Sequence, residues 1–343
     1  MPGAPSLPKG TASSAGQDER AANWTRYWAT GAMHSCVGSF GLGYGDAFSN
    51  WWRLRLAHCT PTQRLVDLAT GGGPVPYLLA QWAAEHGRAM PEIVGVDLAD
   101  VHFEWLHSLP PERASRIVVQ AGVRIEALPF ADASIHVACS HFGFEYADRE
   151  AGLDELSRCL STDGEVAMVM HHSASVIAEV AGHEGAHLDG LLAPGGAVDA
   201  AAGMLEPMAR AATAQGRTAL AGDAAALAAR EAFNAAMRAL QARAAASTVP
   251  DALYEAGEQA NACLAIARQQ GLAQARAAHG MWRQALEDAM LRQRELLGCA
   301  LSPAAAEDLA AALRSRGFDA RIAPLSDCRG RLLAWGLDAR RAR

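Results

Sequence analysis

What the sequence lacks removes several classes of protein from consideration. No apolar run reaches the roughly 18 residues that a membrane-spanning helix needs, and the first 20 residues contain no apolar core of a secretory signal. The seven cysteines are scattered and form no CxxC pair, so we expect neither a disulfide framework nor a zinc knuckle. The net charge of −7 disfavours a surface for nucleic acid or anionic lipid. We therefore expect a cytoplasmic protein with reduced thiols that binds no nucleic acid.

The residues that are present describe a globular chain with distinct regions along its length. Half of the 343 residues are hydrophobic and 20% are charged, which suffices for one large core or two smaller ones. Residues 1–20 are rich in proline, glycine and serine, and we expect them to form a disordered tail. Residues 21–63 are expected to form short helices and glycine turns that carry the aromatic residues Trp24, Tyr27, Trp28, Phe40 and Tyr44.

Between residues 64 and 172 the pattern changes to short apolar runs that alternate with helical segments. Apolar runs separated by helices are typical of parallel strands that are buried on both faces of a doubly wound sheet. The expected strands are 64–70, 92–98, 116–122, 135–142 and 165–172. We therefore predict an α/β fold with a Rossmann-like core over 64–172.

The next region, 173–300, is rich in alanine and spaces its apolar residues as helices do. Breaks at 193–196, near Gly222 and at 247–251 predict three to five helices in a bundle. The remaining residues, 301–343, begin with a Ser-Pro helix cap and end in two strand-like runs that complete the sheet. The helical block is therefore predicted to be an insertion between the fifth strand and the last helix.

Three consecutive glycines, Gly71 to Gly73, follow the first predicted strand and precede a helix. Backbone without side chains at a helix N-terminus lets a ligand approach N–H groups and the positive end of the helix dipole. The second strand closes with Asp97, 24 positions after Gly73, where a ribose-binding carboxylate lies in such folds. Together they predict a nucleoside-containing cofactor. A dinucleotide is disfavoured, because Pro76 occupies the last glycine position of that fingerprint.

The chain resembles class I S-adenosylmethionine-dependent methyltransferases, in the small-molecule branch that includes ubiquinone/menaquinone C-methyltransferases. The resemblance rests on DLATGGG at 67–73, on RIEALPFADASIHVACSHFGFEYAD at 124–148, and on LDELSRCLSTDGEVAMVMHH at 153–172. It covers roughly 64–172 and the last 40 residues. It implies a seven-stranded sheet, S-adenosyl-L-methionine as cofactor, and methyl transfer to O, N or C of a small-molecule acceptor.

The resemblance also implies roles for individual residues. The methionine part of the cofactor would lie over Gly71 and Gly73, its ribose on Asp97, and its adenine on Leu98 and beside residues 124–126. The full set of implied cofactor contacts is Tyr27, Asp67, Ala69, Thr70, Gly71, Gly73, Asp97, Leu98, Arg124, Ile125, Glu126, Ser140 and His141, with Asp67 orienting the amino group and Ser140 and His141 flanking the sulfonium. The aromatic residues of 21–63 would form a lid over the cofactor, or else anchor that segment on the sheet.

Three positions depart from the family pattern. Ala69 replaces the usual first glycine, Arg124 stands where an adenine-contacting Asp is usual, and His136 replaces another Asp. The change at 124 implies that adenine recognition shifts to the backbone of Ile125. These departures keep open the alternative of a non-catalytic, methyltransferase-like scaffold whose helical insertion binds a partner.

Histidines at the ends of the fourth and fifth strands are candidates for a general base. The sulfonium is already an activated leaving group, so alignment supplies most of the rate, and a base is needed only if the acceptor must lose a proton early. We name His141 first, followed by His171 and His172, because histidine titrates near neutral pH. Each of them is otherwise a pocket wall or a buried hydrogen-bonding group.

The motif HEGAH at 183–187 matches the H-E-x-x-H pattern of zinc hydrolases, with Glu184 as base and Glu206 as a third-ligand candidate. Two glycines weaken that helix, and APGG at 193–196 interrupts the chain before Glu206. We therefore interpret the motif as coincidental and expect no metal site. The insertion is expected to form the acceptor pocket or a homodimer surface instead.

Overall fold

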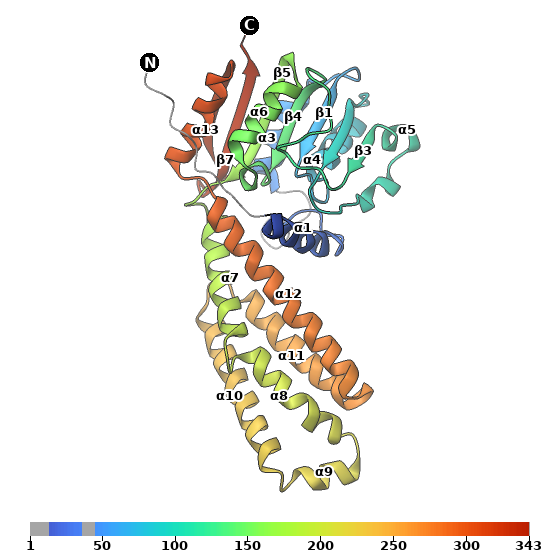
Figure 1. Cartoon of the computed structure of the whole chain (residues 1–343), viewed down its shortest axis with the longest axis vertical. Helices are drawn as coiled ribbons and strands as arrows, with labels where there is room; N and C mark the ends of the chain where they lie inside the picture. The colour runs from blue at the N-terminus through green and yellow to red at the C-terminus, as the bar shows by residue number, and fades with distance from the viewer. Residues whose placement is uncertain (1–13, 36–44, 343) are drawn as a thin grey trace. The chain divides into compact units, whose positions relative to one another are not determined.

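The computed structural model describes residues 14–35 and 45–342. The chain divides into two compact units (Figure 1). The sheet unit comprises the chain up to Ala178 and from Cys299 onward, and the helical unit is Glu179–Gly298. Within the described residues, no helix is both long enough and apolar enough to cross a membrane.

The sheet unit contains seven strands in the order β3-β2-β1-β4-β5-β7-β6. The first five strands are parallel, and β7 runs antiparallel to both β5 and β6. The strand bounds are β1 Arg64–Leu68, β2 Glu92–Val96, β3 Ile117–Gln120, β4 Ile135–His141, β5 Leu160–His171, β6 Phe318–Ser326 and β7 Leu332–Arg341. This architecture confirms the predicted seven-stranded, Rossmann-like sheet.

Side chains along each strand alternate between two buried layers, which explains the nearly continuous apolar runs. Val66 and Leu68 of β1 share one core cluster with residues of α6 (Arg149–Cys159) and α13 (Pro303–Ser315). Leu65, which precedes Val66 on the strand, is also fully buried and points to the other layer. There α3 (Gly45–Leu56) packs on α4 (Pro74–Glu85). Shorter elements link the strands: η1 Glu104–Ser108, α5 Pro111–Ala114 and η2 Phe144–Tyr146.

The N-terminal part of the chain departs from the sequence prediction. Helix α1 spans Ser14–Trp28, so residues 14–20 belong to a helix and not to the predicted disordered tail. Its last turns carry the aromatic residues that face the pocket described below. The predicted lid residues Phe40 and Tyr44 lie outside the described residues, as do residues 1–13.

The helical unit follows β5, as predicted, and the chain returns to the sheet through α13. Six helices are described over 173–300, where three to five were predicted: α7 Val176–Leu192, α8 Ala197–Arg210, α9 Ala214–Leu220, α10 Ala224–Ala246, α11 Asp251–Gln270 and α12 Leu272–Cys299. The predicted breaks at 193–196, Gly222 and 247–251 are all present. The additional breaks lie at 211–213, where Thr213 caps α9, and at Gly271, whose φ of 94° ends α11. The unit has its own apolar core.

Candidate functional site

The turn between β1 and α4 is built from the three glycines, and each of them is covered by protein atoms. A Cβ added to Gly71 would lie 2.5 Å from Trp28 Cζ2, and one added to Gly73 would lie 2.6 Å from the Phe103 ring. A Cβ on Gly72 would lie 2.5 Å from the carbonyl oxygen of Ala32. The bare backbone therefore accommodates the N-terminal segment and Phe103. The sequence argument had assigned this space to a ligand alone.

Ala69, immediately before this turn, adopts a φ of 52°. This left-handed conformation costs a residue with a Cβ roughly 1–2 kcal/mol, and the resembling family has glycine at this position. Alanine at position 69 therefore introduces local backbone strain into this turn.

We expect Ala69→Gly to raise the free energy of unfolding by about 1 kcal/mol, the relieved strain less the extra chain entropy of glycine. Urea denaturation measures the change. The matched control is Ala84→Gly on the exposed side of α4, which should lower stability by about 1 kcal/mol. Equal losses in both variants would show that residue 69 is not strained.

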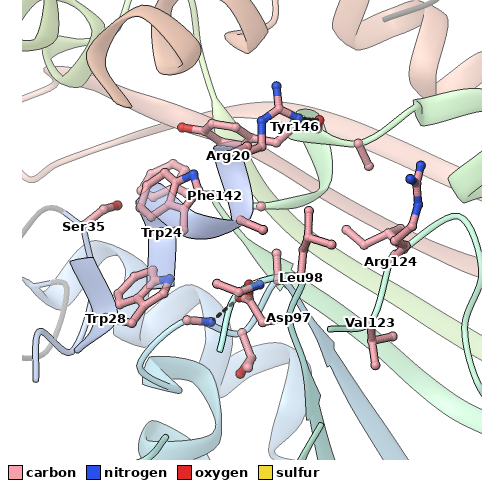
Figure 2. A pocket seen from close by; sticks show the side chains of 18 of the residues that line it. Arg20, Trp24, Trp28, Ser35, Asp97, Leu98, Val123, Arg124, Phe142 and Tyr146 are labelled. Atoms are coloured by element: carbon pink, nitrogen blue, oxygen red, sulfur yellow. Dashed lines mark hydrogen bonds between the residues drawn. The ribbon is translucent and has the colours of Figure 1, made fainter. Parts of the chain in front are cut away.

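A pocket lies at the carboxyl ends of β1, β2 and β4 (Figure 2). Its lining comes from α1, the glycine turn, the residues after β2, segment 123–126 and the segment that follows β4. The lining residues are Arg20, Ala21, Trp24, Trp28, Ser35, Ala69, Thr70, Gly71, Pro74, Asp97, Leu98, Ala99, Val123, Arg124, Ile125, Glu126, His141, Phe142, Gly143, Tyr146 and Ala147.

Asp97 is the buried carboxylate of this pocket. Its Oδ2 accepts a hydrogen bond from the Gly71 N–H at 2.9 Å, drawn dashed in Figure 2, and its Oδ1 accepts one from the Ala99 N–H at 2.9 Å. Burial raises the pKa of Asp97 to about 6, against the opposing effect of these backbone donors. These two hydrogen bonds hold the carboxylate of Asp97 in one orientation, between the glycine turn and the residues after β2.

Nine of the predicted site residues meet at this pocket, and the remaining six do not line it. Those that line it are Ala69, Thr70, Gly71, Asp97, Leu98, Arg124, Ile125, Glu126 and His141. Those that do not are Tyr27, Asp67, Gly73, Ser140, His171 and His172.

Asp67 and Ser140 lie behind the pocket and hold the strand ends. Asp67 accepts hydrogen bonds from Thr70 Oγ1 at 2.6 Å and from Cys139 Sγ at 3.4 Å. Burial raises its pKa to about 7. Ser140 Oγ donates to the Leu68 carbonyl at 2.9 Å. Both side chains therefore brace the glycine turn, where the resemblance implied contact with the cofactor.

One wall of the pocket comes largely from α1, and it includes Trp24 and Trp28 of the predicted lid together with Arg20, which sequence reasoning missed. The rings of Trp24 and Trp28 stack with centroids 5.6 Å apart, and Trp24 meets Tyr146 edge-on at 6.1 Å. Arg20 Nη1 donates to the Tyr146 carbonyl at 3.1 Å and so ties α1 to the segment after β4. Tyr27 donates from its hydroxyl to the His34 carbonyl at 3.1 Å and shapes the turn that follows α1. The helical spacing of residues 20, 24 and 28 was the available signal.

His141 lines the pocket, and a hydrogen bond from Trp52 of α3 holds its ring. Trp52 Nε1 donates to His141 Nδ1 at 2.9 Å. Burial lowers the pKa of His141 well below its usual value, with further lowering from His34 and His171. These conditions disfavour the protonated imidazolium that a general base would have to form.

The other two candidate bases point to opposite faces of the sheet, because adjacent residues on a strand alternate. His171 Nδ1 lies 2.7 Å from Glu145 Oε1, and both side chains are buried. His172 stacks on Trp335 at 4.4 Å and accepts a hydrogen bond from the Ala174 N–H at 2.9 Å. Burial lowers the pKa of His172. His172 is thus a packing residue next to the last strand.

Phe142 was also missed by the sequence argument, although it lines the pocket. Its φ of 56° is unusual for a bulky side chain and is the kind of strain found near functional sites. The Phe142 N–H donates to the Val169 carbonyl at 2.8 Å, and the ring stacks on His171 with centroids 4.1 Å apart. These contacts hold the strained backbone in place.

Two of the departures from the family pattern have structural partners. His136 Nδ1 accepts a hydrogen bond from the Arg64 N–H at 3.0 Å. Arg124 lies 3.5 Å from Glu126, whose Oε1 accepts a hydrogen bond from the Asp148 N–H at 2.9 Å. In Figure 2 Arg124 lies across the pocket from Trp28.

The residues of HEGAH engage neighbouring helices of the helical unit. His187 Nε2 lies 2.9 Å from Ser247 Oγ, and Glu184 accepts a hydrogen bond from Gln293 Nε2 at 2.6 Å. Glu206 lies 3.6 Å from Arg210 on α8. Over residues 14–35 and 45–342, no group of three His, Cys, Asp or Glu side chains is arranged to hold a metal ion. Nothing in this geometry supports the hydrolase alternative.

Comparison with known proteins identifies the central part of the sheet unit. Residues 66–168 match the family described as a methyltransferase domain. Two similar curated proteins are the ubiquinone/menaquinone biosynthesis C-methyltransferases UbiE of Legionella pneumophila strains Lens and Paris. Each is 28% identical over 130 residues, which is 36% of this chain and 49% of the relative. The chain thus matches about half the length of these relatives.

Similar solved structures include a geranyl diphosphate methyltransferase in complex with GPP and sinefungin, at 17% identity over 46% of this chain and 66% of that chain, with a TM-score of 0.35. Another is geranyl diphosphate C-methyltransferase from Streptomyces coelicolor A3(2), at 16% identity over 46% and 65% of the two chains, also with a TM-score of 0.35.

The matched range, residues 66–168, contains the glycine turn, Asp97, the strands β2, β3 and β4, and most of β1 and β5. This central part of the sheet unit is therefore similar to methyltransferase domains.

Proposed function

We propose that this protein transfers the methyl group of S-adenosyl-L-methionine to a small-molecule acceptor. The observation that carries the proposal is Asp97, a buried carboxylate at the end of β2 that lines the pocket beside the glycine turn. It lies within the range that matches the methyltransferase domain. Carboxylate oxygens at this place are suited to accept hydrogen bonds from the two hydroxyls of a ribose.

The lining of the pocket fits the other parts of the cofactor. Leu98, Val123 and Ile125 offer apolar surface for adenine, and Gly71 lines the pocket close to the N-terminus of α4. The rings of Trp24 and Tyr146 form an aromatic wall, which suits a sulfonium or another cation. When bound, the cofactor supplies an activated methyl group, and the protein has to align the acceptor with it.

The proposal is tested by incubating the purified protein with methyl-labelled S-adenosylmethionine and fractionated small-molecule extracts. Formation of S-adenosylhomocysteine together with a labelled product supports it. Asp97→Ala should abolish the signal, whereas Glu165→Ala on the half-exposed His58 pair should leave it unchanged. Cofactor binding without turnover on any fraction would favour the scaffold alternative.

The raised pKa of Asp97 predicts a pH dependence of cofactor binding. The ionised carboxylate accepts both hydroxyls, and the protonated form prevails below about pH 6. Affinity for S-adenosylhomocysteine should therefore be constant from pH 7 to 8 and fall about tenfold for each pH unit below 6. Calorimetric titration across this range measures it. Asp97→Asn, which does not titrate, should bind weakly with no such slope; an unchanged slope in that variant would assign the titration to another group.

We also propose roles for the remaining parts of the chain. The helical unit, which has its own core, would shape the acceptor pocket or form a homodimer surface. Light scattering of the full chain separates the two, because a dimer would double the 36.1 kDa mass. The composition supports a cytoplasmic location, which fractionation of the source cells would test.

A further inference from the structure

Segment 123–132 forms one side of the pocket, and the described residues 121–134 contain neither helix nor strand. The residues of this segment that line the pocket are Val123, Arg124, Ile125 and Glu126. At the pocket end the Val123 N–H donates to the Asp97 carbonyl at 2.8 Å, and the Ala127 N–H donates to the Arg124 carbonyl at 3.2 Å. A segment outside the regular hydrogen-bond ladders needs partners from side chains elsewhere to fix its conformation.

Arg158, at the C-terminal end of α6, supplies such partners. An arginine carries five N–H donors in a planar fork, and the Arg158 side chain makes five hydrogen bonds. Nη1 donates to the Phe130 carbonyl at 2.9 Å and to Asp132 Oδ1 at 2.6 Å, and Nη2 donates to the Leu128 carbonyl at 3.3 Å. One side chain thus holds three positions of the segment.

Glu155, one turn earlier on α6, connects the same helix to the segment a second time. Its Oε1 accepts a hydrogen bond from the Leu128 N–H at 2.8 Å. The two remaining bonds of Arg158 go to this carboxylate, from Nε at 2.9 Å and from Nη2 at 2.6 Å. Hydrogen bonding to Arg158 lowers the pKa of Glu155, so the carboxylate stays ionised at neutral pH. Leu128 is therefore held at both its N–H and its carbonyl.

The other end of α6 reaches the part of the segment that lines the pocket. Asp148, the N-cap of α6, donates from its N–H to Glu126 Oε1 at 2.9 Å. A Cβ added to Gly152 would lie 3.2 Å from Ile125 Cγ2, so the helix backbone approaches the segment closely. Contacts along the whole length of α6 therefore define where this side of the pocket lies.

We propose that Arg158 and Glu155 are positioning residues for the cofactor. They hold segment 123–132 in the conformation that presents Val123 and Ile125 to the adenine of S-adenosylmethionine, so binding does not have to order the segment. The inference rests on the proposed function. Neither Arg158 nor Glu155 is among the residues that line the pocket, so both act through the segment.

A second arginine on α6 contacts provides the matched control. The side chain of Arg316 donates to Asp154 Oδ1 at 2.9 Å and to Glu150 Oε1 at 2.5 Å, both on α6, and to the Ala312 carbonyl of α13 at 3.0 Å. Arg316→Ala therefore removes an arginine bonded to two carboxylates and a carbonyl group, as Arg158→Ala does, and leaves the contacts of segment 123–132 in place.

The first test needs no ligand and follows hydrogen exchange of the full chain by mass spectrometry. Arg158→Ala should accelerate exchange of the amides of 123–132 tenfold or more, and Arg316→Ala should leave it within twofold of wild type. Arg158→Lys keeps the charge but has three donors and no planar fork. It should accelerate exchange at least threefold, and it tests the same claim if the alanine variant does not fold. Wild-type exchange in the Arg158 variants, or equal acceleration in Arg316→Ala, would overturn the inference.

The second test measures binding by calorimetry. Arg158→Ala should weaken binding of S-adenosylhomocysteine and of 5′-methylthioadenosine tenfold or more, because both carry adenine, and Arg316→Ala should stay within twofold of wild type. Glu155→Gln keeps an oxygen that accepts from the Leu128 N–H and should stay within threefold, whereas Glu155→Leu should lose tenfold. Wild-type affinity in Arg158→Ala, or a glutamine variant as weak as the leucine variant, would contradict the proposal.

Turnover separates positioning from catalysis. Arg158→Ala should raise the KM for S-adenosylmethionine tenfold or more and leave kcat within threefold, since the lost interaction serves binding and not the methyl-transfer step. A fall in kcat with unchanged KM would overturn the assignment.

These tests fail independently of the proposed function. Absence of cofactor binding to the wild type would remove the function and leave the exchange result standing. Cofactor binding that Arg158→Ala does not weaken would leave the function and remove the inference.

Discussion

Replacing Glu145 with alanine is expected to lower the free energy of unfolding by about 2–6 kcal/mol, because two buried donors of His171 would lose their acceptor at about 1–3 kcal/mol each. Glu145 Oε1 accepts two hydrogen bonds from His171, one from the backbone N–H at 2.8 Å and one from Nδ1 at 2.7 Å. The two side chains are 0% and 1% exposed, so water cannot replace the lost acceptor. Urea denaturation followed by circular dichroism measures the loss.

A second histidine–glutamate pair provides the control for this prediction. His58 Nε2 lies 2.9 Å from Glu165 Oε2, nearly the same separation, but the His58 side chain is 41% exposed. Glu165 Oε1 also lies 2.9 Å from Arg340 Nη2, whose side chain is 68% exposed. Because solvent screens both pairs, Glu165→Ala should cost about 1 kcal/mol or less. If Glu145→Ala cost no more than this control, the buried pair would not be stabilising the junction of β4 and β5.

Gly72→Ala is expected to release the N-terminal segment from the glycine turn. The new Cβ would lie 2.5 Å from the carbonyl oxygen of Ala32 and 2.6 Å from that of Met33, and both are backbone atoms that cannot turn aside. The sheet unit should remain folded, because the clash is confined to segment 14–35. Limited chymotrypsin digestion should cleave at Trp24 to Trp28 at least tenfold faster than in wild type.

The released segment should also weaken cofactor binding by about tenfold or more, because α1 supplies one wall of the pocket. Gly280→Ala serves as control, since a Cβ at that position of α12 meets nothing within 4 Å. Its digestion rate and cofactor affinity should match the wild type. Unchanged proteolysis of Gly72→Ala would show that residues 32 and 33 do not rest on the turn.

The sheet could be predicted from the sequence because its strands are buried on both faces and bounded by turn residues. Asp97 could be placed as well, since the spacing from glycine turn to acid follows from the length of one helical crossover. The start of α1 at Ser14 was hidden by a tail-like composition. The break at Gly271 was hidden because alanine-rich helical periodicity continues on both sides of it.

The parts of the site that could not be predicted depend on contacts between distant segments. Gly72 has no room for a side chain because the backbone carbonyl groups of residues 32 and 33 lie against it. The ring of His141 is oriented by a hydrogen bond from Trp52. Neither contact can be predicted from the spacing of residues within one segment of the sequence. The sequence could, however, have predicted that His171 and His172 point to opposite faces of the sheet, because adjacent residues on a strand alternate.

The central claim is that the pocket at Asp97 binds S-adenosylmethionine, and calorimetric titration of the full chain tests it most directly. Wild type should bind S-adenosylmethionine and S-adenosylhomocysteine with micromolar affinity at pH 7.5. Asp97→Ala should weaken both by a hundredfold or more, through loss of two hydrogen bonds to a charged acceptor. Failure of the wild type to bind either compound, or equal binding by Asp97→Ala, would contradict this account of the site.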